Sequence, residues 1–577
     1  MTKTIAEQNL PFVSPSDLRH PDEVMRLGRL GSAFPHRLSF MRVLMRQLSQ
    51  QSDIHFKIKN QLDDDGYGRM VLGVTLAGRR FSLVAFSRPL APENRTDRVI
   101  ATAWDACFCL YDGEPDDATL DWLEGHVPYQ EQGHYSDKIL TLSRANKSVR
   151  LFNKVVELLS DGQQPDKDML LETGYLMRTT AVYGNGKFGI SDRAGAANHT
   201  GMDAPFQAEM LTVWLIRAFS FALVSHIAAQ RGGDRAVSLS SEARTCLGIG
   251  NSTGLGMAPF LMNHPCLIHS WIIARETALA RVRLTAGIDR LPQFAKLIEE
   301  TRRHLAYWQV ADDIQSQRIT LLKAELATFQ AEKLPALQAH DLPFDEVMRS
   351  VNDASFEMQE LMAALIIELG PEWVDELSHC LSNPHQEKLD PAMSVAALKQ
   401  LIHHHYQWAL DLDLTRAGSD ALFWYVSEEK LEPRLGLRHE EPGSELEMPF
   451  DIAHQVQHLN QMIKDKENTN AQGARDHLLV AEFVMAHPEC RSIVKRIQTI
   501  ARYPYGEIRD NLVDQSCRPI DLLRAKLSFF GASAFDPKSD RWVRITLFQG
   551  APLAEQFDTE KAKSWYFAHP LPESCSH

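Results

Sequence analysis

The longest apolar segment of the chain runs from Met210 to Val224 and contains one charged residue, Arg217. Its length of about 15 residues falls short of the roughly 20 that a helix needs to cross a bilayer. We therefore expect a helix that is buried in the core of a soluble protein. Because burying an unpaired charge is costly, the segment also predicts a partner for Arg217.

The first 146 residues predict a small α+β domain. Strand-like segments at Met70–Leu76 and Phe81–Phe86, joined by a turn at 77–79, indicate a β-hairpin, and Val99–Tyr111 indicates another strand. A helix from about Arg37 to Gln50 would pack on this antiparallel sheet.

From Lys147 onward the periodicity of apolar residues is mainly that of α-helices. The helix-compatible segments, separated by Gly, Pro or Asn, are Phe206–Gln230, Pro265–Leu284, Leu291–Phe329, Phe344–Leu369 and Val395–Trp408. The polar face of Ala311–Lys333 favours a projecting helical arm or a hairpin. Near the C-terminus, the alternation of Trp542–Phe548 predicts a strand that would return to the N-terminal sheet.

These patterns predict an α+β fold that is predominantly α-helical. The regions are a small N-terminal antiparallel sheet domain at 1–146, a helical region with glycine loops at 147–335, and a helical region ending in a strand at 336–577. If the last strand joins the N-terminal sheet, the N-terminal domain contains residues from both ends of the sequence.

The composition of the chain argues against two classes of binding partner. The formal net charge of −14 argues against nucleic acid and anionic membranes, because both require a cationic surface. The cysteines show no paired metal spacing, and the segment after Met1 lacks the apolar run of a signal peptide. We expect a cytoplasmic protein that binds neither nucleic acid nor membrane.

Four glycines lie close together in Cys246–Gly256, directly before a helix-like apolar run. Glycines let backbone N–H groups approach a ligand, and a helix start offers unpaired donors, so this stretch suits a phosphate or carboxylate. The residues that we expect to bind the anion are Gly250, Asn251, Ser252, Thr253 and Gly254. A tight packing turn is the alternative. A nicotinamide site is disfavoured, because the upstream residues are polar and the downstream region stays helical.

A second glycine loop, Tyr183–Gly189, places Lys187 among three glycines. It lacks both the glycine spacing of a phosphate-binding P-loop and the Ser or Thr after the lysine, so ATP use by that mechanism is not expected. One interpretation is a loop that covers the substrate, with Lys187 sharing a pocket with Asn251–Gly254. The other is an ordinary exposed turn.

Groups suited to proton transfer lie between the two glycine loops in the sequence. His199 occurs in a loop at 195–201, and Glu209 precedes Arg217 by about two helical turns. We expect His199 or Glu209 to be the catalytic acid or base and Arg217 to clamp the anion. The alternatives are an exposed histidine and a structural ion pair.

Metal-ligand patterns are incomplete. Asp451, His454 and His458 would form one helical stripe, but a di-iron bundle needs Glu and Glu-x-x-His contributions from several helices. No metal site is predicted and no cofactor is identified. Aromatic and arginine-containing clusters at Arg416–Tyr425 and Tyr503–Asp510 suit a pocket wall or a subunit interface, so a homo-oligomer is compatible with the sequence.

The leading interpretation is a soluble enzyme that acts on a small carboxylate or phosphorylated metabolite by proton transfer. The residues do not separate lyase, hydrolase and isomerase reactions. A non-catalytic helical scaffold for protein contacts is the alternative. A metal or redox oxygenase using His454 and His458 is a third interpretation.

Overall fold

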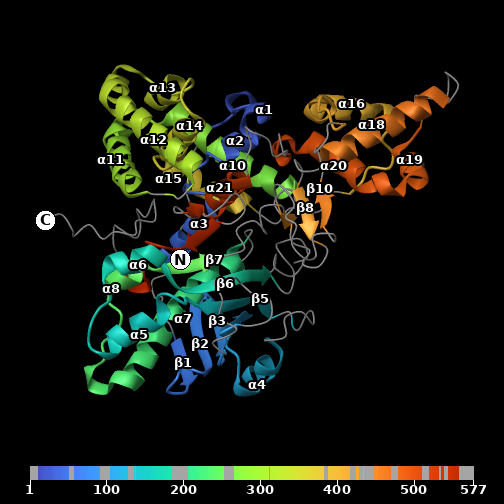
Figure 1. Ribbon diagram of the computed structural model, residues 1–577. Coiled ribbons are helices and arrows are strands. Elements are labelled where there is room, and N and C mark those ends of the chain that lie inside the picture. The colour runs from blue at the N-terminus through green and yellow to red at the C-terminus, as the bar shows by residue number, and fades with distance from the viewer. Residues whose placement is uncertain are drawn as a thin grey trace, which may run out of the picture.

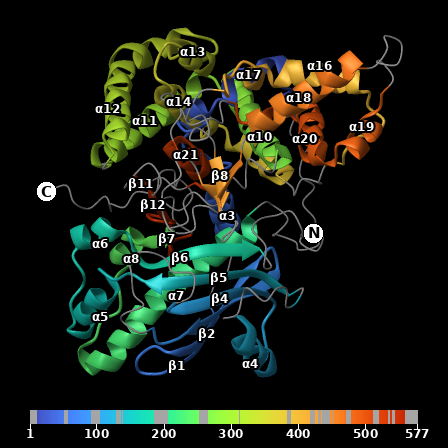
Figure 2. The same cartoon turned by 45° about the vertical axis from the view of Figure 1, so that its right-hand side comes forward.

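The computed structural model describes residues 11–50, 57–90, 104–127, 136, 138–184, 206–251, 265–308, 310, 312–381, 388–415, 424–427, 433–434, 447–450, 452–469, 478–509, 519–531, 535–537 and 543–557. A β-sheet with its own helices forms one layer, and a helical body lies beyond it (Figure 1). The body has two lobes, made of the described helices within residues 291–374 and of those within residues 395–502 (Figures 1 and 2). The predicted fold class, α+β with a predominance of helix, is confirmed.

The main sheet is mixed and contains nine strands within the described ranges. In spatial order they are β1 (Lys57–Leu62), β2 (Gly68–Leu76), β3 (Arg79–Ser87), β4 (Ala106–Asp112), β5 (Ile139–Lys147), β6 (Tyr175–Gly184), β7 (Gly248–Asn251), β12 (Val543–Leu547) and β11 (Phe535–Pro537). Neighbours are antiparallel except β6 and β7, which are parallel. The predicted hairpin is β2–β3, and the predicted C-terminal strand is β12, which joins the sheet through β7.

The alternation of side chains along the strands gives the sheet two apolar faces. On β3, Leu83 faces the main core, whereas Val84 belongs to a second cluster that also includes residues of α4 (Asp117–His126). The main-core face is covered by α5 (Phe152–Ser160) and α7 (Gln207–Gly232). Strands β2 to β5 are therefore buried on both sides, whereas β1 at the edge is largely exposed.

The predicted apolar segment lies in α7, which is 26 residues long. Its sheet-facing side places Thr212 Oγ1 at 2.6 Å from Thr141 Oγ1 and packs Phe219 edge-on against Phe108. With the turn to Arg235, the helix is long and apolar enough to cross a membrane by length and composition. However, 78% of its most apolar window is buried inside the protein, as expected for a core helix.

Most of the remaining helices lie either beside the sheet or in the helical body. Beside the sheet are α6 (Lys167–Thr173) and α8 (Ser241–Cys246). The helical body contains α10 (Pro265–Thr285), α11 (Leu291–Tyr307), α12 (Asp313–Thr328), α13 (Pro343–Ser350), α14 (Phe356–Ile367), α15 (Pro371–Val374), α16 (Val395–His405), α17 (Gln407–Leu410), α18 (Ile452–Thr469), α19 (Val480–Ala486) and α20 (Arg491–Arg502). A small sheet of β10 (Glu447–Phe450), β8 (Trp424–Ser427) and β9 (Pro433–Arg434) lies beside the second lobe.

Two of the predicted long helices are each divided in two. Leu291–Phe329 divides into α11 and α12 because the Asp312 side chain caps the start of a new helix. Phe344–Leu369 divides into α13 and α14, and Ser355 caps the second of these. Of the two alternatives for Ala311–Lys333, the structure supports a hairpin, since α12 packs against α11 and α14.

The N-terminal segment, residues 15–49, crosses from the helical body to the sheet. It contains α1 (Pro21–Val24), α2 (Leu27–Leu30) and α3 (Phe40–Ser49). In both views α3 and α21 (Pro519–Phe530) lie between the sheet and the body (Figures 1 and 2). The helix predicted at Arg37–Gln50 is confirmed as α3, which begins three residues later and ends one residue earlier.

Arginines of this segment pair with buried carboxylates of the helical body. Arg19 donates to Glu276 of α10 (2.8 Å) and to Glu360 of α14 (2.6 Å). Arg29 also donates to Glu360 (3.0 Å). These charges form the first half of what we call the arginine network.

The second half of the arginine network involves Glu368, directly after α14, and Asp375, directly after α15. Arg42 pairs with Glu368, and Arg37 pairs with Asp375. Arg46 lies 3.5 Å from the same Asp375. The pairs hold α3 and the residues before it against the end of α14 and the end of α15.

Glu360→Gln should lower the free energy of unfolding at pH 7 by about 4 kcal/mol, because it removes a buried charge partner of several arginines. Burial acts to raise the pKa of Glu360, but Arg19, Arg275 and Arg29 outweigh it and lower the pKa to about 2. The unfolded chain then binds more protons between about pH 4.5 and 2, so the stabilisation is lost as pH falls through that window.

Urea unfolding measured from pH 2.5 to 7 checks this. As the pH falls below 4.5, the free energy of unfolding should decrease more steeply for the wild type than for Glu360→Gln. The control is Glu332→Gln at an exposed position, which should stay within about 0.5 kcal/mol of wild type. Parallel curves for Glu360→Gln and wild type would contradict the prediction.

Candidate functional site

The structure describes only some of the predicted site residues. Lys187, His199, Ser252, Thr253 and Gly254 lie outside the described residues. The remaining predicted residues are Gly250 and Asn251 on β7, and Glu209 and Arg217 on α7. Whether the two glycine loops share a pocket stays a prediction.

The first half of the glycine stretch is a strand, which corrects the expectation of a loop there. Gly250 lies opposite Arg178 of β6 on one side and Thr546 of β12 on the other, so both edges of β7 are paired. A Cβ atom at Gly250 would lie 2.7 Å from the ring of Tyr175, and one at Gly248 would overlap the carbonyl oxygen of Leu547. These placements favour the packing alternative for Gly248 and Gly250.

Arg217 is paired, but with backbone carbonyls. Its Nε donates to Leu247 O (2.7 Å), and its Nη2 donates to Arg244 O (3.0 Å) and Ala551 O (3.1 Å). A longer bond from Nη1 reaches Pro552 O at 3.5 Å. The first two carbonyls are at the end of α8, where a positive charge also suits the helix dipole.

The alternative of a structural ion pair between Glu209 and Arg217 is not supported, because these two described side chains do not pair with each other. Eight residues place them about 80° apart around the helix. Glu209 is buried in the first turn of α7. Burial lowers the pKa of Arg217 to about 9, and the nearby charge of Arg244 acts in the same direction.

A pocket of about 330 Å³ opens beside Arg217. We call it the α7 pocket. One stripe of α7, at every third or fourth residue, forms a wall of Trp214, Arg217, Ala218, Phe221, Ala222 and Ser225. The other walls come from β1, β2, the segment at 238–244 and the segment at 553–555. Apolar side chains make up most of the lining.

The charges in the pocket wall favour an anion. Arg244 pairs with Glu555 at 2.5 Å, with exposed side-chain fractions of 28% and 48%. The Nε of Arg244 is buried and has no hydrogen-bond partner in the described part of the chain. With Arg217 held by carbonyls, the lining residues carry two guanidinium charges against one carboxylate.

Sequence reasoning missed the pocket residues Arg244 and Glu555, because they lie about 300 positions apart in the sequence. It also missed Lys526 of α21, whose side chain is almost fully buried. Burial lowers the pKa of Lys526 to about 7. The signal available was two cationic residues, Arg524 and Lys526, in a mainly apolar segment at 522–530, similar to the signal that identified Arg217.

The metal interpretation gains no support from the described residues. No group of three or more His, Cys, Asp or Glu side chains is placed there to hold a metal ion. His454 and His458 lie on α18, whereas Asp451 lies outside the described ranges.

Arg217→Met should lower the free energy of unfolding by about 3 kcal/mol, because buried carbonyls would lose their donor. Arg231→Met, at an exposed position of the same helix, is the matched control and should change it by no more than about 0.5 kcal/mol. Equal stability of both variants in urea would show that the carbonyls do not depend on Arg217.

Gly248→Ala should cost about 3 kcal/mol of unfolding free energy, since a Cβ has no room beside Leu547. Gly125→Ala in α4 faces open space and should be neutral or stabilising by up to about 1 kcal/mol. Thermal and urea unfolding of both variants provide the measurement. A wild-type melting curve for Gly248→Ala would argue against the packing role.

Comparisons with models of protein families, with curated proteins and with solved structures give no match to this chain. The chemistry of the α7 pocket is therefore the basis for a proposal on function.

Proposed function

We propose that the protein is an enzyme for a small anionic metabolite with an apolar body, which it binds in the α7 pocket. The observation that supports this most is the unpartnered Nε–H of Arg244 in the wall of a mainly apolar pocket. An anionic group would satisfy that donor. The volume of about 330 Å³ falls within the usual range of small-molecule sites.

The two arginines have different parts in this proposal. Arg217 uses its N–H groups to hold the pocket wall and contributes a fixed positive charge. Arg244 is partly exposed and can turn toward a ligand, at the expense of a salt bridge with little net energy. Trp214 and Phe221 offer the apolar surface that the rest of the ligand would cover.

Proton transfer is the chemistry that we propose for the bound molecule. Glu555 is the carboxylate among the described lining residues, and it lies beside Arg244, the residue that would turn away from it to hold the anion. A carboxylate within reach of a substrate can act as a general base. His199 remains a further candidate for this role.

Octanoate and octanol, matched in chain length, test the binding step. We expect octanoate to bind at least about tenfold more tightly, because only the acid carries a charge for Arg244. Trp214 fluorescence and calorimetry provide the measurements. Ala222→Trp should fill the pocket and abolish binding, whereas Ala229→Trp, exposed on the same helix, should leave it unchanged. Equal affinity for the two compounds, or binding insensitive to Ala222→Trp, would overturn the proposal.

Deuterium exchange tests the chemical step. A mixture of small carboxylic acids incubated with the protein in D₂O should gain deuterium next to a carboxylate, as followed by mass spectrometry. Glu555→Gln should reduce the exchange rate by about a hundredfold or more while octanoate still binds. Undiminished exchange in Glu555→Gln would assign the proton transfer to another group. Absence of exchange in the wild type would contradict the proposed proton transfer, and only the proposed binding of an anion would stand.

A further inference from the structure

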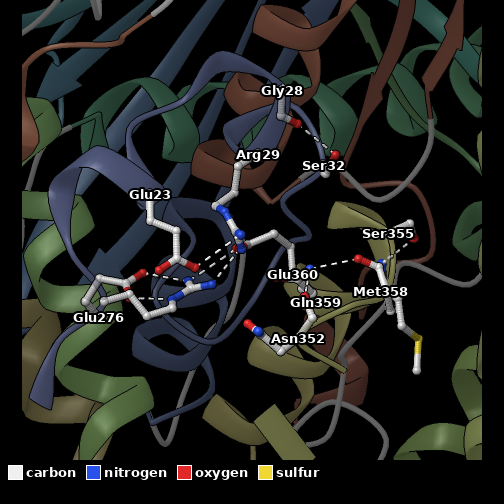
Figure 3. Close-up of polar contacts among 12 residues, drawn as sticks. Glu23, Gly28, Arg29, Ser32, Glu276, Asn352, Ser355, Met358, Gln359 and Glu360 are labelled. Carbon is white, nitrogen blue, oxygen red and sulfur yellow. Dashed lines mark hydrogen bonds and ion pairs between the residues drawn. The ribbon is translucent and has the colours of Figure 1, made fainter. Parts of the chain in front are cut away.

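A small enclosed cavity lies where the N-terminal segment meets α10 and α14. Its volume is about 10 Å³, the size that holds one water-sized atom. Its polar lining consists of Arg19, His36, Arg275 and Glu360, and its other walls are apolar. Figure 3 shows the surrounding part of the arginine network, with Glu360 at its centre.

His36 offers a hydrogen-bond donor with no partner. Its ring is 1% exposed and stacks on Trp271 with 5.1 Å between ring centroids. Its Nδ1 accepts the N–H of Leu38 at 3.2 Å, so the proton of the neutral ring is on Nε2. Burial lowers the pKa of His36 well below its usual value, and Arg275 and Arg42 add to the shift. Nε2 is buried and has no partner in the described part of the chain.

The carboxylate that lines the cavity, that of Glu360, has no remaining acceptor capacity. Its Oε1 accepts from Arg19 (2.6 Å) and Arg29 (3.0 Å), while its Oε2 accepts from Arg19 (3.4 Å) and lies 3.3 Å from Nη1 of Arg275. Each carboxylate oxygen has two lone pairs, so both oxygens of Glu360 are fully used. Glu276, which lies behind these arginines and does not line the cavity, accepts from Arg19 and Arg275 at Oε1 and from Arg19 at Oε2.

Donors and positive charge are in excess at the same place. Each guanidinium carries five N–H groups, and the Nε of Arg29 is a further buried donor without a partner among the described residues. Arg19, Arg29 and Arg275 face only two buried carboxylates, those of Glu276 and Glu360. The additional partner of Arg29, Glu23, is 45% exposed and thus screened by solvent.

We propose that this cavity binds a halide ion, which accepts the Nε2–H of His36 and N–H groups of the neighbouring arginines. A water molecule fits by size but would bring two O–H donors to a cavity whose lining carboxylate, Glu360, has no free acceptor. A halide only accepts hydrogen bonds and offsets the excess charge. Such an ion would link the N-terminal segment to α10 and α14, independently of any ligand in the α7 pocket.

Bromide identifies the site directly. Crystals of the full chain grown or soaked in sodium bromide should show anomalous scattering in the cavity beside His36. Density there with no anomalous signal would mean water and would overturn the proposal. This measurement uses the wild-type protein, so it does not depend on a variant that folds.

Thermal unfolding gives the solution test. At equal ionic strength, sodium bromide should raise the Tm by about 2 to 4 °C relative to sodium gluconate, because the ion binds only the folded state. His36→Phe keeps an aromatic ring on Trp271 but removes the donor, and should weaken bromide binding by at least about tenfold. His269→Phe is the matched control, since His269 is a partly buried histidine outside this cavity. Equal Tm values in the two salts for the wild type would contradict the proposal.

Discussion

The pairing of buried arginines with buried carboxylates is the constraint on which the arrangement of the molecule depends. Arg19 joins Glu276 and Glu360, and so fixes α10 and α14 relative to one another as well as to the N-terminal segment. Desolvating such charges is expensive, and only complete pairing compensates for it. The helices therefore have one relative placement that gives each of these buried carboxylates its arginine partners, whereas apolar contacts alone would tolerate several.

The central helix α7 contributes both to the core of the sheet and to the wall of the α7 pocket. One side, with Thr212 and Phe219, completes the core of the sheet, and the other, with Ala218 and Ala222, forms the wall of the α7 pocket. Arg217 explains how these roles coexist. The end of α8 and the turn at 551–552 present carbonyls that need donors, and a guanidinium from α7 supplies them without another backbone segment.

Local patterns predicted the elements that depend on local physics. The β2–β3 hairpin, the buried character of α7 and the strand at β12 all follow from apolar periodicity in short windows. Helix boundaries were less accurate because a single cap decides them. Asp312 is one polar residue in a polar segment, and its capping role shows only when the next helix is seen.

The candidate site was less predictable because its parts are joined only by the fold. Gly250 looked like a loop residue because the polar stretch upstream gives no strand signal, yet pairing with β6 and β12 makes it part of a sheet. Such pairing is a long-range effect that overrides local propensity. Arg217 was identified by its unusual context, but its carbonyl partners at 551–552 come from the other end of the chain.

The position of β12 has a consequence for how the protein is made. β7 is complete once residue 251 has been synthesised, but its second partner is not produced until residues 543–547. During translation of the intervening segment, one edge of β7 has no neighbour from its own sheet, and an uncovered strand edge can pair with another chain. Ribosomes that stall before residue 543 would thus release chains with an open sheet. The strand β12, made almost 300 residues after β7, closes this edge against association between nascent chains.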